Sequence, residues 1–347
     1  MASREDVVAL KDELIASSRR PAGWIDGAEF QAVAERPQLA VPVALGITAD
    51  PDGGPGAALE ILIQGHSIGA RQAAEQIRDQ AEERKMPFVV AEVEEANLPL
   101  RQDVEATPGH KMLTGRCDPL HIGASIGHVD GWAGTLGCFV EKGGRIGLLS
   151  CSHVLAMSGR PTRDQILIHQ PGKPDMQPPI FTGSTRVATL QDEYVEFSLN
   201  EANLIDAALA FLKRPDNHLS NVIPGRLGCA LGGKRLAAVM DLAEIPLPLR
   251  VAKIGRTTGY TEGTLTSILD RVAVRNREIG AVISFNQVLS VRWDDKGTPF
   301  TKAGDSGALV FSVDGLRPVG LHFASPGGRS YACPLQKVLD VFEARLI

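Results

Sequence analysis

The sequence predicts a mainly β protein in which a sandwich or barrel follows a small α/β unit. From residue 133 onward, about ten short apolar runs recur with turn residues between them and without regular intervening helices. The chain holds 36 glycines and 22 prolines, and only 5% of its residues are aromatic. This composition favours many turns and short strands over long helices. A hydrophobic content of 44% with 22% charged residues is typical of a globular chain with a core.

The first hundred residues combine one helix with a strand–helix–strand pattern. Ser3 and Asp6 match a helix-capping pair, and the following apolar residues share one helical face: Val7, Leu10, Leu14 and Ile15. Residues 41–47, 59–64 and 86–94 are predicted strands, and 70–85 is a predicted charged helix. We therefore interpret 1–100 as an N-terminal helix plus a small α/β accessory domain. This domain could shape substrate access, bind a protein partner or mediate self-association.

The stretch 101–132 is rich in turn-forming residues and has few strand-like runs, so it is predicted to be a linker. The β-rich region then begins. Residues 134–140 and 145–152 flank Lys142-Gly143-Gly144, which is a hairpin signal. The further predicted strands are 203–212, 249–255, 263–270, 281–285, 288–293, 307–313 and 318–324. A helix is predicted over 336–347, with an apolar face formed by Val338, Leu339, Phe342 and Leu346.

Several classes of function are disfavoured by composition. No apolar run approaches the roughly 20 residues that a membrane helix needs, so no membrane contact is expected. The net charge of −5 argues against a nucleic-acid partner. The N-terminus lacks the apolar segment of a secretory signal, and we therefore expect a cytoplasmic protein. No metal or organic cofactor is expected.

Cysteine usage agrees with that location. The five cysteines are Cys117, Cys138, Cys151, Cys229 and Cys333. They are odd in number and lack a CxxC pattern, so we expect free buried thiols and no zinc site. Cys138 and Cys151 are the one pair that a predicted hairpin brings near each other. His110, His121 and His128 show no metal-ligand spacing and are interpreted as loop residues.

Three segments of the β-rich region carry reactive side chains. His153 lies where an apolar strand enters a loop, Asp206 lies inside an apolar strand, and Ser306 lies in Ala-Gly-Asp-Ser-Gly-Ala before another strand. Each feature alone has an ordinary structural explanation, such as a satisfied histidine or a turn. However, a buried carboxylate is costly unless it is paired. The order His, Asp, Ser, with spacings of 53 and 100 residues, therefore points to a common site.

These residue types together perform nucleophilic catalysis. A serine hydroxyl is a weak nucleophile and needs a base within hydrogen-bond reach. Histidine can accept and return the proton, while aspartate sets the ring tautomer and stabilises the imidazolium. The backbone N–H groups of Gly304 and Ser306 would form an oxyanion hole, typically worth about 3 kcal/mol per donor.

Residues 133–347 resemble trypsin-like (chymotrypsin-fold) serine peptidases in TLGCFV, LLSCSHVLA, IDAAL, KAGDSGALVF and HFASPGGRSYACPLQKVL. Within this family, the segments GTLGCFV, KIGRTTGYTEGTLTSI and AGDSGALVF are most similar in sequence to the Nal1-like bacterial and plant intracellular group. The resemblance implies two six-stranded β-barrels, about 133–215 and 225–335, followed by the helix 336–347. It also implies that His153, Asp206 and Ser306 form a triad between the barrels and hydrolyse polypeptide substrates. Ser-Cys-Ser-His replaces the usual Ala-Ala-His, which puts the usual neighbouring disulfide in doubt.

The same resemblance implies a substrate pocket. Phe300 would lie near the base of the S1 pocket, where it offers no attraction to a basic P1 side chain. Thr301, His322 and Ser325 fall where glutamyl endopeptidases hold an acidic P1 side chain, and Phe323 belongs to the same GLHFAS run. An imidazole and two hydroxyls can donate hydrogen bonds to a carboxylate. The alternative interpretation of His322 is an ordinary strand residue.

Other functions compete with this interpretation. The chain could be a catalytically silent or latent peptidase fold that acts as a binding scaffold through its N-terminal domain. A GDSL-type lipase would carry its serine near the N-terminus of an α/β fold, whereas here Ser306 comes last, among strands. Ala308 occupies the second glycine position of GxSxG, which disfavours an α/β-hydrolase.

Overall fold

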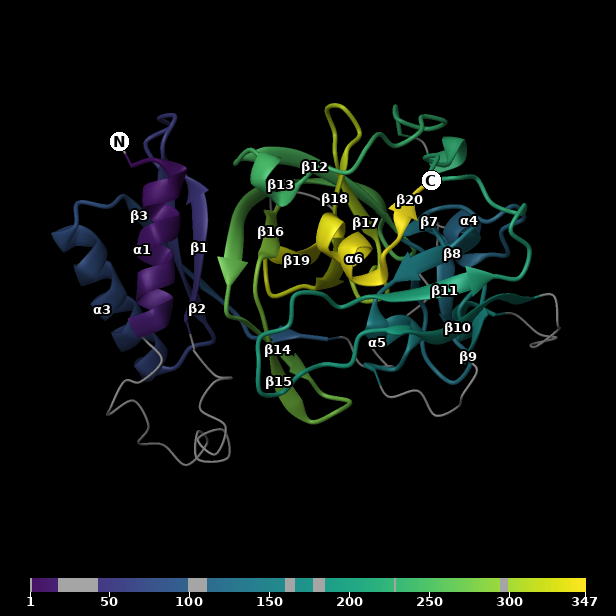
Figure 1. The fold of residues 1–347 in the computed structure, drawn as a ribbon, viewed down its shortest axis with the longest axis horizontal. Helices are drawn as coiled ribbons and strands as arrows, with labels where there is room; N and C mark the ends of the chain where they lie inside the picture. Colours follow the sequence, from purple (N-terminus) through teal and green to yellow (C-terminus); the bar gives the residue numbers. More distant parts are fainter. Residues whose placement is uncertain are drawn as a thin grey trace.

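Two curved β-sheets dominate the computed structural model of the chain (Figure 1). The structure describes residues 2–17, 43–98, 111–159, 166–176, 185–227, 229–293 and 299–347. His110, which the sequence suggests is a loop residue, lies outside these ranges. The N-terminal unit, the C-terminal barrel and the other barrel follow one another along the longest axis of the molecule (Figure 1).

The C-terminal half forms a closed barrel, which we call barrel 2. Its strands are β12 (Leu249–Gly255), β13 (Gly259–Asp270), β16 (Val288–Arg292), β17 (Leu309–Ser312), β18 (Pro318–Ala324) and β19 (Arg329–Pro334). The order β12-β17-β18-β19-β16-β13, with β13 returning to pair with β12, closes a ring of six antiparallel strands. Val251, Leu265, Val291 and Phe300 fill its interior and are fully buried. Apolar side chains that alternate along strands thus face one enclosed core.

The other sheet forms barrel 1. Its strands are β5 (Ser125–His128), β6 (Gly134–Thr135), β7 (Cys138–Lys142), β8 (Arg145–Ser150), β9 (Ile166–His169), β10 (Arg186–Tyr194), β11 (Ala208–Leu212) and β20 (Arg345–Leu346). The order is β20-β7-β8-β11-β10-β9-β5-β6. Only Leu136 and Gly137 separate β6 from β7, and their N–H groups donate to Ala124 and Leu149. Counted as one bent strand, β6 and β7 therefore pair with β5 at one end and β8 at the other, which gives a ring of six strands with β20 added at the edge of β7.

These observations confirm the predicted mainly β fold with two barrels, a C-terminal helix and a preceding α/β unit. The hairpin signal is also confirmed, because Gly143 and Gly144 form the turn between β7 and β8 with φ of 56° and 77°. β5 lies inside the stretch 101–132 that the sequence indicates as a linker, and it pairs with β9. A four-residue strand whose partner lies elsewhere in the chain leaves little local signal.

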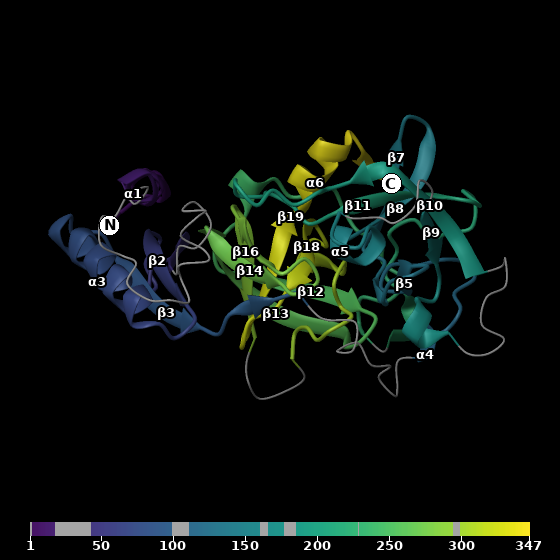
Figure 2. The same ribbon diagram turned by 90° about the horizontal axis from the view of Figure 1, so that it is seen from below.

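The N-terminal unit contains α1 (Arg4–Ser17), β1 (Val43–Ala49), β2 (Ala57–Gln64), α3 (Ile68–Glu83) and β3 (Phe88–Val93). Both helices pack on one face of the strands, and Leu10, Leu45, Ile61 and Ile77 belong to the shared core (Figure 2). The capping pair is confirmed, since the Ser3 N–H donates to Asp6 and the Asp6 N–H donates to Ser3 Oγ. β1 pairs antiparallel with β13, so this sheet continues into barrel 2.

Smaller elements complete the fold. They are β4 (Ala96–Asn97), α4 (Lys111–Thr114), α5 (Ser152–Leu155), β14 (Val272–Asn276), β15 (Ala281–Phe285), α6 (Leu335–Phe342) and 3-10 helices at Lys173–Asp175, Gly225–Leu227 and Leu242–Glu244. β4 pairs parallel with β14 and thereby joins the β14–β15 hairpin. In the described part of the chain, every helix is too short or too polar to cross a membrane.

The C-terminal helix differs from its predicted range of 336–347. It ends at Phe342 because Glu343 takes a left-handed conformation with φ of 49°. Val338, Leu339 and Phe342 are buried, as their spacing predicts. Leu346 instead lies in β20, which pairs with β7 at the edge of barrel 1. Residues that helical periodicity assigned to the helix thus form a strand, because they can pair with the otherwise unpaired edge of β7.

Candidate active site

His153 and Asp206 meet because of the register between two neighbouring strands. β8 and β11 run antiparallel with Ser150 opposite Ala208. The chain leaves β8 for α5 at the end where it enters β11, so His153 and Asp206 lie beside each other. His153 Nδ1 lies 2.5 Å from Asp206 Oδ2, and the His153 main-chain N–H donates to Asp206 Oδ1 at 3.2 Å. Both side chains are almost completely buried, with exposed fractions of 2% and 0%.

This contact sets the histidine tautomer. A carboxylate only accepts hydrogen bonds, so Nδ1 carries the hydrogen in the neutral ring and Nε2 has a free lone pair. Nε2 is buried, and within the described residues it has no hydrogen-bond partner. The ring is therefore arranged to accept a proton at Nε2.

Ser306 lies in the loop before β17, and barrel 1 contacts its main chain. The Thr135 N–H donates to the Ser306 carbonyl at 2.8 Å. A Cβ built on Gly134 would lie 2.6 Å from the Val154 side chain and 2.9 Å from the Ser306 carbonyl oxygen. The residue after His153 and the main chain of Ser306 thus both approach Gly134. The Ser306 hydroxyl does not hydrogen-bond to His153 Nε2 in this structure.

The loop that carries Ser306 contains two main-chain N–H groups without a protein acceptor among the described residues. Gly304 has φ of +94°, a conformation that favours glycine. The Asp305 N–H donates to Lys302 at 3.0 Å and the Gly307 N–H donates to His322 at 2.8 Å. Across the described ranges, the N–H groups of Gly304 and Ser306 donate to no protein acceptor. They are the two groups that the sequence indicates as oxyanion donors.

Asp305 anchors this loop from inside barrel 2. It is fully buried, and its carboxylate lies 3.3 Å from Lys253 Nζ. It also accepts hydrogen bonds from the N–H groups of Thr257, Thr258 and Lys302, and from Thr258 Oγ1 at 2.6 Å. Burial raises the pKa of Asp305, but Lys253 and these hydrogen bonds outweigh it and hold the pKa below its usual value.

The sequence interpretation missed this anchor. Lys253 stands in the apolar strand LRVAKIG, where a buried cation needs a partner for the same reason as Asp206. That signal identifies a paired lysine but not its partner. The neighbouring Arg256-Thr257-Thr258 has the composition of a polar turn between two strands, whereas the structure buries Arg256 completely.

The predicted pocket residues divide into two groups. Thr301 Oγ1 and Ser325 Oγ lie 2.6 Å apart. His322 is buried, with Nδ1 2.8 Å from Ser330 Oγ and 3.1 Å from the Tyr331 carbonyl oxygen. Burial lowers the pKa of His322 to about 3, so its ring is neutral at pH 7.

Phe300 and Phe323 are also buried, but their side chains are apolar and belong to hydrophobic clusters. Phe300 belongs to the barrel 2 core and Phe323 packs against Phe285 with ring centroids 4.8 Å apart. Both side chains therefore contribute apolar packing at these positions and no hydrogen-bond donor.

The cysteines are all free thiols, including Cys138 and Cys151. Cys151, His153 and Asp206 place ligand atoms within 4.8 Å of one another. Burial raises the pKa of the Cys151 thiol well above its usual value, and Sγ–H donates to the His322 carbonyl at 3.1 Å. A metal would need the thiolate. This environment therefore suits a neutral thiol better than a metal ligand.

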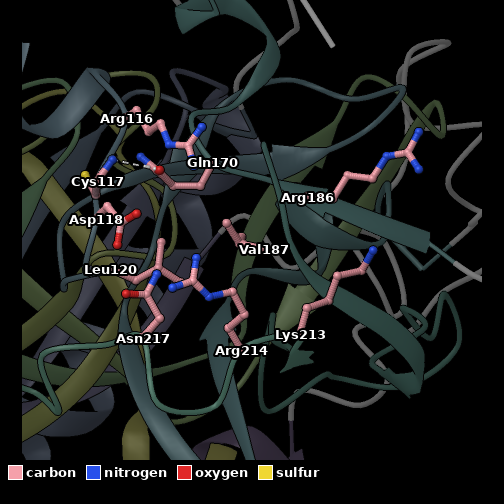
Figure 3. Close-up of a pocket in the computed structure, with 10 residues that line it drawn as sticks. All are labelled: Arg116, Cys117, Asp118, Leu120, Gln170, Arg186, Val187, Lys213, Arg214 and Asn217. Carbon is pink, nitrogen blue, oxygen red and sulfur yellow. Dashed lines mark hydrogen bonds between the residues drawn. The ribbon is translucent and has the colours of Figure 1, made fainter. Parts of the chain in front are cut away.

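A surface cavity on barrel 1 lies apart from these residues (Figure 3). It is lined by Arg116, Cys117, Asp118, Leu120, Gln170, Arg186, Val187, Lys213, Arg214 and Asn217. The Gln170 side chain accepts from the Cys117 N–H at 2.9 Å, while Arg186 and Lys213 extend away from this contact (Figure 3). None of the predicted site residues lines this cavity.

Comparison with known proteins gave structural matches only. The sequence matches no protein-family model and no curated protein. Among solved structures, a glutamic acid-specific serine protease that uses a histidine triad in substrate binding is similar, with 17% identity and a TM-score of 0.46 over 66% of this chain and 100% of that one. Cellulomonas bogoriensis chymotrypsin (16% identity, TM-score 0.44) and Thermobifida fusca protease A (15%, 0.44) each match 66% of this chain and 99% of their own. Such low identity transfers no residue roles.

Proposed function

We propose that the chain is a serine endopeptidase in which Ser306 is the nucleophile, His153 the general base and acid, and Asp206 the residue that orients the histidine. The observation that carries this proposal is the buried His153–Asp206 pair with its unbonded Nε2, in a segment whose Val154 approaches Gly134 from one side while the Ser306 carbonyl approaches it from another. Asp206 would stabilise the imidazolium that forms when Ser306 loses its proton.

The oxyanion hole would be formed by the N–H groups of Gly304 and Ser306. Both are free of protein acceptors in the described structure, while their neighbours Asp305 and Gly307 are bonded. Donors of this kind stabilise the negative oxygen of the tetrahedral intermediate. Acylation of Ser306 and hydrolysis of the acyl-enzyme would follow, with no metal or organic cofactor.

A fluorophosphonate probe tests this proposal. Ser306 should become labelled in the folded chain, and intact-protein mass spectrometry should show one adduct. Ser306→Ala should abolish the adduct and His153→Ala should slow it, whereas the matched control Ser312→Ala on β17 should be labelled normally. Folded protein that takes no label would favour the scaffold function instead.

We further propose a preference for acidic P1 residues. The Thr301–Ser325 hydroxyl pair supports it, because a hydroxyl can donate to a carboxylate. His322 would add a donor at Nε2 only in the tautomer in which Nδ1 accepts from Ser330 instead of donating to the Tyr331 carbonyl. Hydrogen bonds to a charged group contribute about 1.5–3 kcal/mol, so peptides with Glu at P1 should be cleaved about tenfold or more faster than those with Gln. Equal or better cleavage after Leu would contradict this preference.

The Nal1-like relationship and a cytoplasmic location also remain proposals. The first depends on the motifs quoted above, and the second is supported by five free cysteines, which are typical of a reducing compartment.

A further inference from the structure

Arg256 and Asp175 form a fully buried ion pair between the two barrels. Arg256 follows β12 of barrel 2, and Asp175 ends the 3-10 helix Lys173–Asp175 between β9 and β10 of barrel 1. Arg256 Nε donates to Asp175 Oδ2 at 2.8 Å, and Nη2 donates to Oδ1. Neither side chain is exposed to solvent. Ser125 Oγ, from β5, donates to the same carboxylate at 2.5 Å and ties it to barrel 1.

The guanidinium also reaches the loop that carries Ser306. Nη1 of Arg256 donates to Thr257 Oγ1 at 3.0 Å, and this hydroxyl donates to the Ala303 carbonyl at 2.8 Å. A Cβ built on Gly304 would lie 2.6 Å from Arg256 Nη1. Gly304 therefore packs directly on the guanidinium, and its place depends on where Arg256 is held.

The main chain of Arg256 makes a second connection to the same loop. Its N–H donates to Thr135 Oγ1 at 3.0 Å, and this hydroxyl donates to the Gly304 carbonyl at 2.9 Å. The Thr135 N–H in turn donates to the Ser306 carbonyl. Thr135 belongs to barrel 1, the barrel that carries His153. Arg256 thus lies where barrel 1, barrel 2 and the Ser306 loop meet.

We propose that the Arg256–Asp175 pair is a positioning device that sets Gly304 and Ser306 relative to His153; this inference depends on the function proposed for Ser306. A buried ion pair is weak evidence for stability, because its desolvation cost offsets much of its attraction. Its two-bond geometry instead fixes orientation, which a lysine in place of arginine could not do. The Arg256–Asp175 pair connects barrel 1 with barrel 2, whereas the Lys253–Asp305 pair connects the Ser306 loop to barrel 2 alone.

The test compares Asp175→Asn and Arg256→Lys with a matched control. Asp175→Asn keeps the shape but loses the charge, and Arg256→Lys keeps the charge but loses the paired donors. The control, Lys11→Gln, breaks the largely buried Lys11–Asp270 pair between α1 and barrel 2. For each variant we would measure amide hydrogen exchange over residues 302–307, the rate of fluorophosphonate labelling, and Tm.

Both positioning variants should show faster exchange over 302–307 and about tenfold to hundredfold slower labelling, since a displacement of about 1 Å costs that much in rate. Lys11→Gln should lower Tm and change neither the hydrogen exchange over 302–307 nor the labelling rate. Asp175→Asn with a lower Tm but unchanged exchange and labelling would overturn the proposal. If Asp175→Asn does not fold, Arg256→Lys decides by the same two measurements. If the wild-type chain takes no label, the peptidase proposal fails, and the exchange comparison still decides the positioning role.

Discussion

Replacing Asp206 by asparagine is the most direct perturbation of the proposed triad. Asn is nearly the same size as Asp, but its side chain has only one accepting oxygen. In the wild-type chain Asp206 accepts two hydrogen bonds from His153, one from the ring Nδ1 and one from the main-chain N–H. The amide group must therefore present its NH₂ to one of these donors.

The main-chain N–H of His153 is always a donor, so the asparagine oxygen should remain on it. The NH₂ group then faces Nδ1, which must give up its hydrogen and accept. Nε2 consequently carries the hydrogen and can no longer act as a base toward Ser306. A wrong tautomer of this kind costs about 10⁴-fold in rate, equivalent to about 5 kcal/mol of transition-state stabilisation.

The assay is the rate constant of fluorophosphonate labelling at Ser306, measured with Tm and circular dichroism to show that the variant is folded. The expected result is a folded chain whose labelling is slower by about four orders of magnitude. A folded Asp206→Asn variant that is labelled within about tenfold of the wild-type rate would refute the reasoning, because the carboxylate would then not set the tautomer.

Three further predictions concern the surroundings of this pair. Since burial lowers the pKa of His322 to about 3 from 6.5, the unfolded chain binds a proton that the folded chain excludes; stability should be full above pH 6.5 and fall toward pH 3 by about 1.4 kcal/mol per pH unit. His322→Gln should reduce the slope of the unfolding free energy against pH by the contribution of one proton, measured by urea unfolding from pH 7 to 4. An unchanged slope would argue against a neutral His322. Gly304→Ala should slow labelling of Ser306 about 100-fold and lower the free energy of unfolding by about 1–3 kcal/mol. The reason is that φ of Gly304 is +94° and the new Cβ would lie 2.5 Å from the Thr257 hydroxyl. Gly144→Ala, at another positive φ of 77° with no atom within 4 Å, should leave the labelling rate unchanged. Lys253→Met should lower the free energy of unfolding by about 3–5 kcal/mol, because it leaves Asp305 buried without its cation; an unchanged urea midpoint would contradict this.

The His153–Asp206 contact could be predicted from sequence because burial makes an isolated charge costly. Asp206 stands in an apolar run, so it had to have a partner, and a histidine at a strand end is a chemically suitable one. The strand register then supplies what the sequence does not contain, namely that Ser150 lies opposite Ala208.

Asp175 could not be found in this way. It lies in the proline-rich stretch PGKPDMQPP and not in an apolar run, and its partner Arg256 is 81 residues away. Nothing in its local pattern distinguishes it from a solvated turn carboxylate. Only the packing of the two barrels removes both side chains from water and makes them a pair.

The N-terminal unit is connected to the rest of the fold by non-local pairing of the same kind. Its residues predict a self-contained accessory domain, and its helices and strands match that pattern. However, β1 covers the edge of β13 from Leu45 to Thr48, and Gly46 lies so close that a Cβ there would be 2.6 Å from the Ile268 carbonyl oxygen. Such close packing of two main chains is typical of strands within one sheet.

Buried charges strengthen that connection. Arg329 donates to Glu60 of β2 at 2.6 Å, and both side chains are only 4% exposed. Arg329 begins β19, directly after the run that contains His322 and Ser325. If the N-terminal unit were removed, Arg329 would keep its charge without the Glu60 carboxylate, and β13 would lose its pairing with β1 and present an unpaired edge. The N-terminal unit is therefore joined to barrel 2 both by strand pairing and by a buried ion pair at the start of β19.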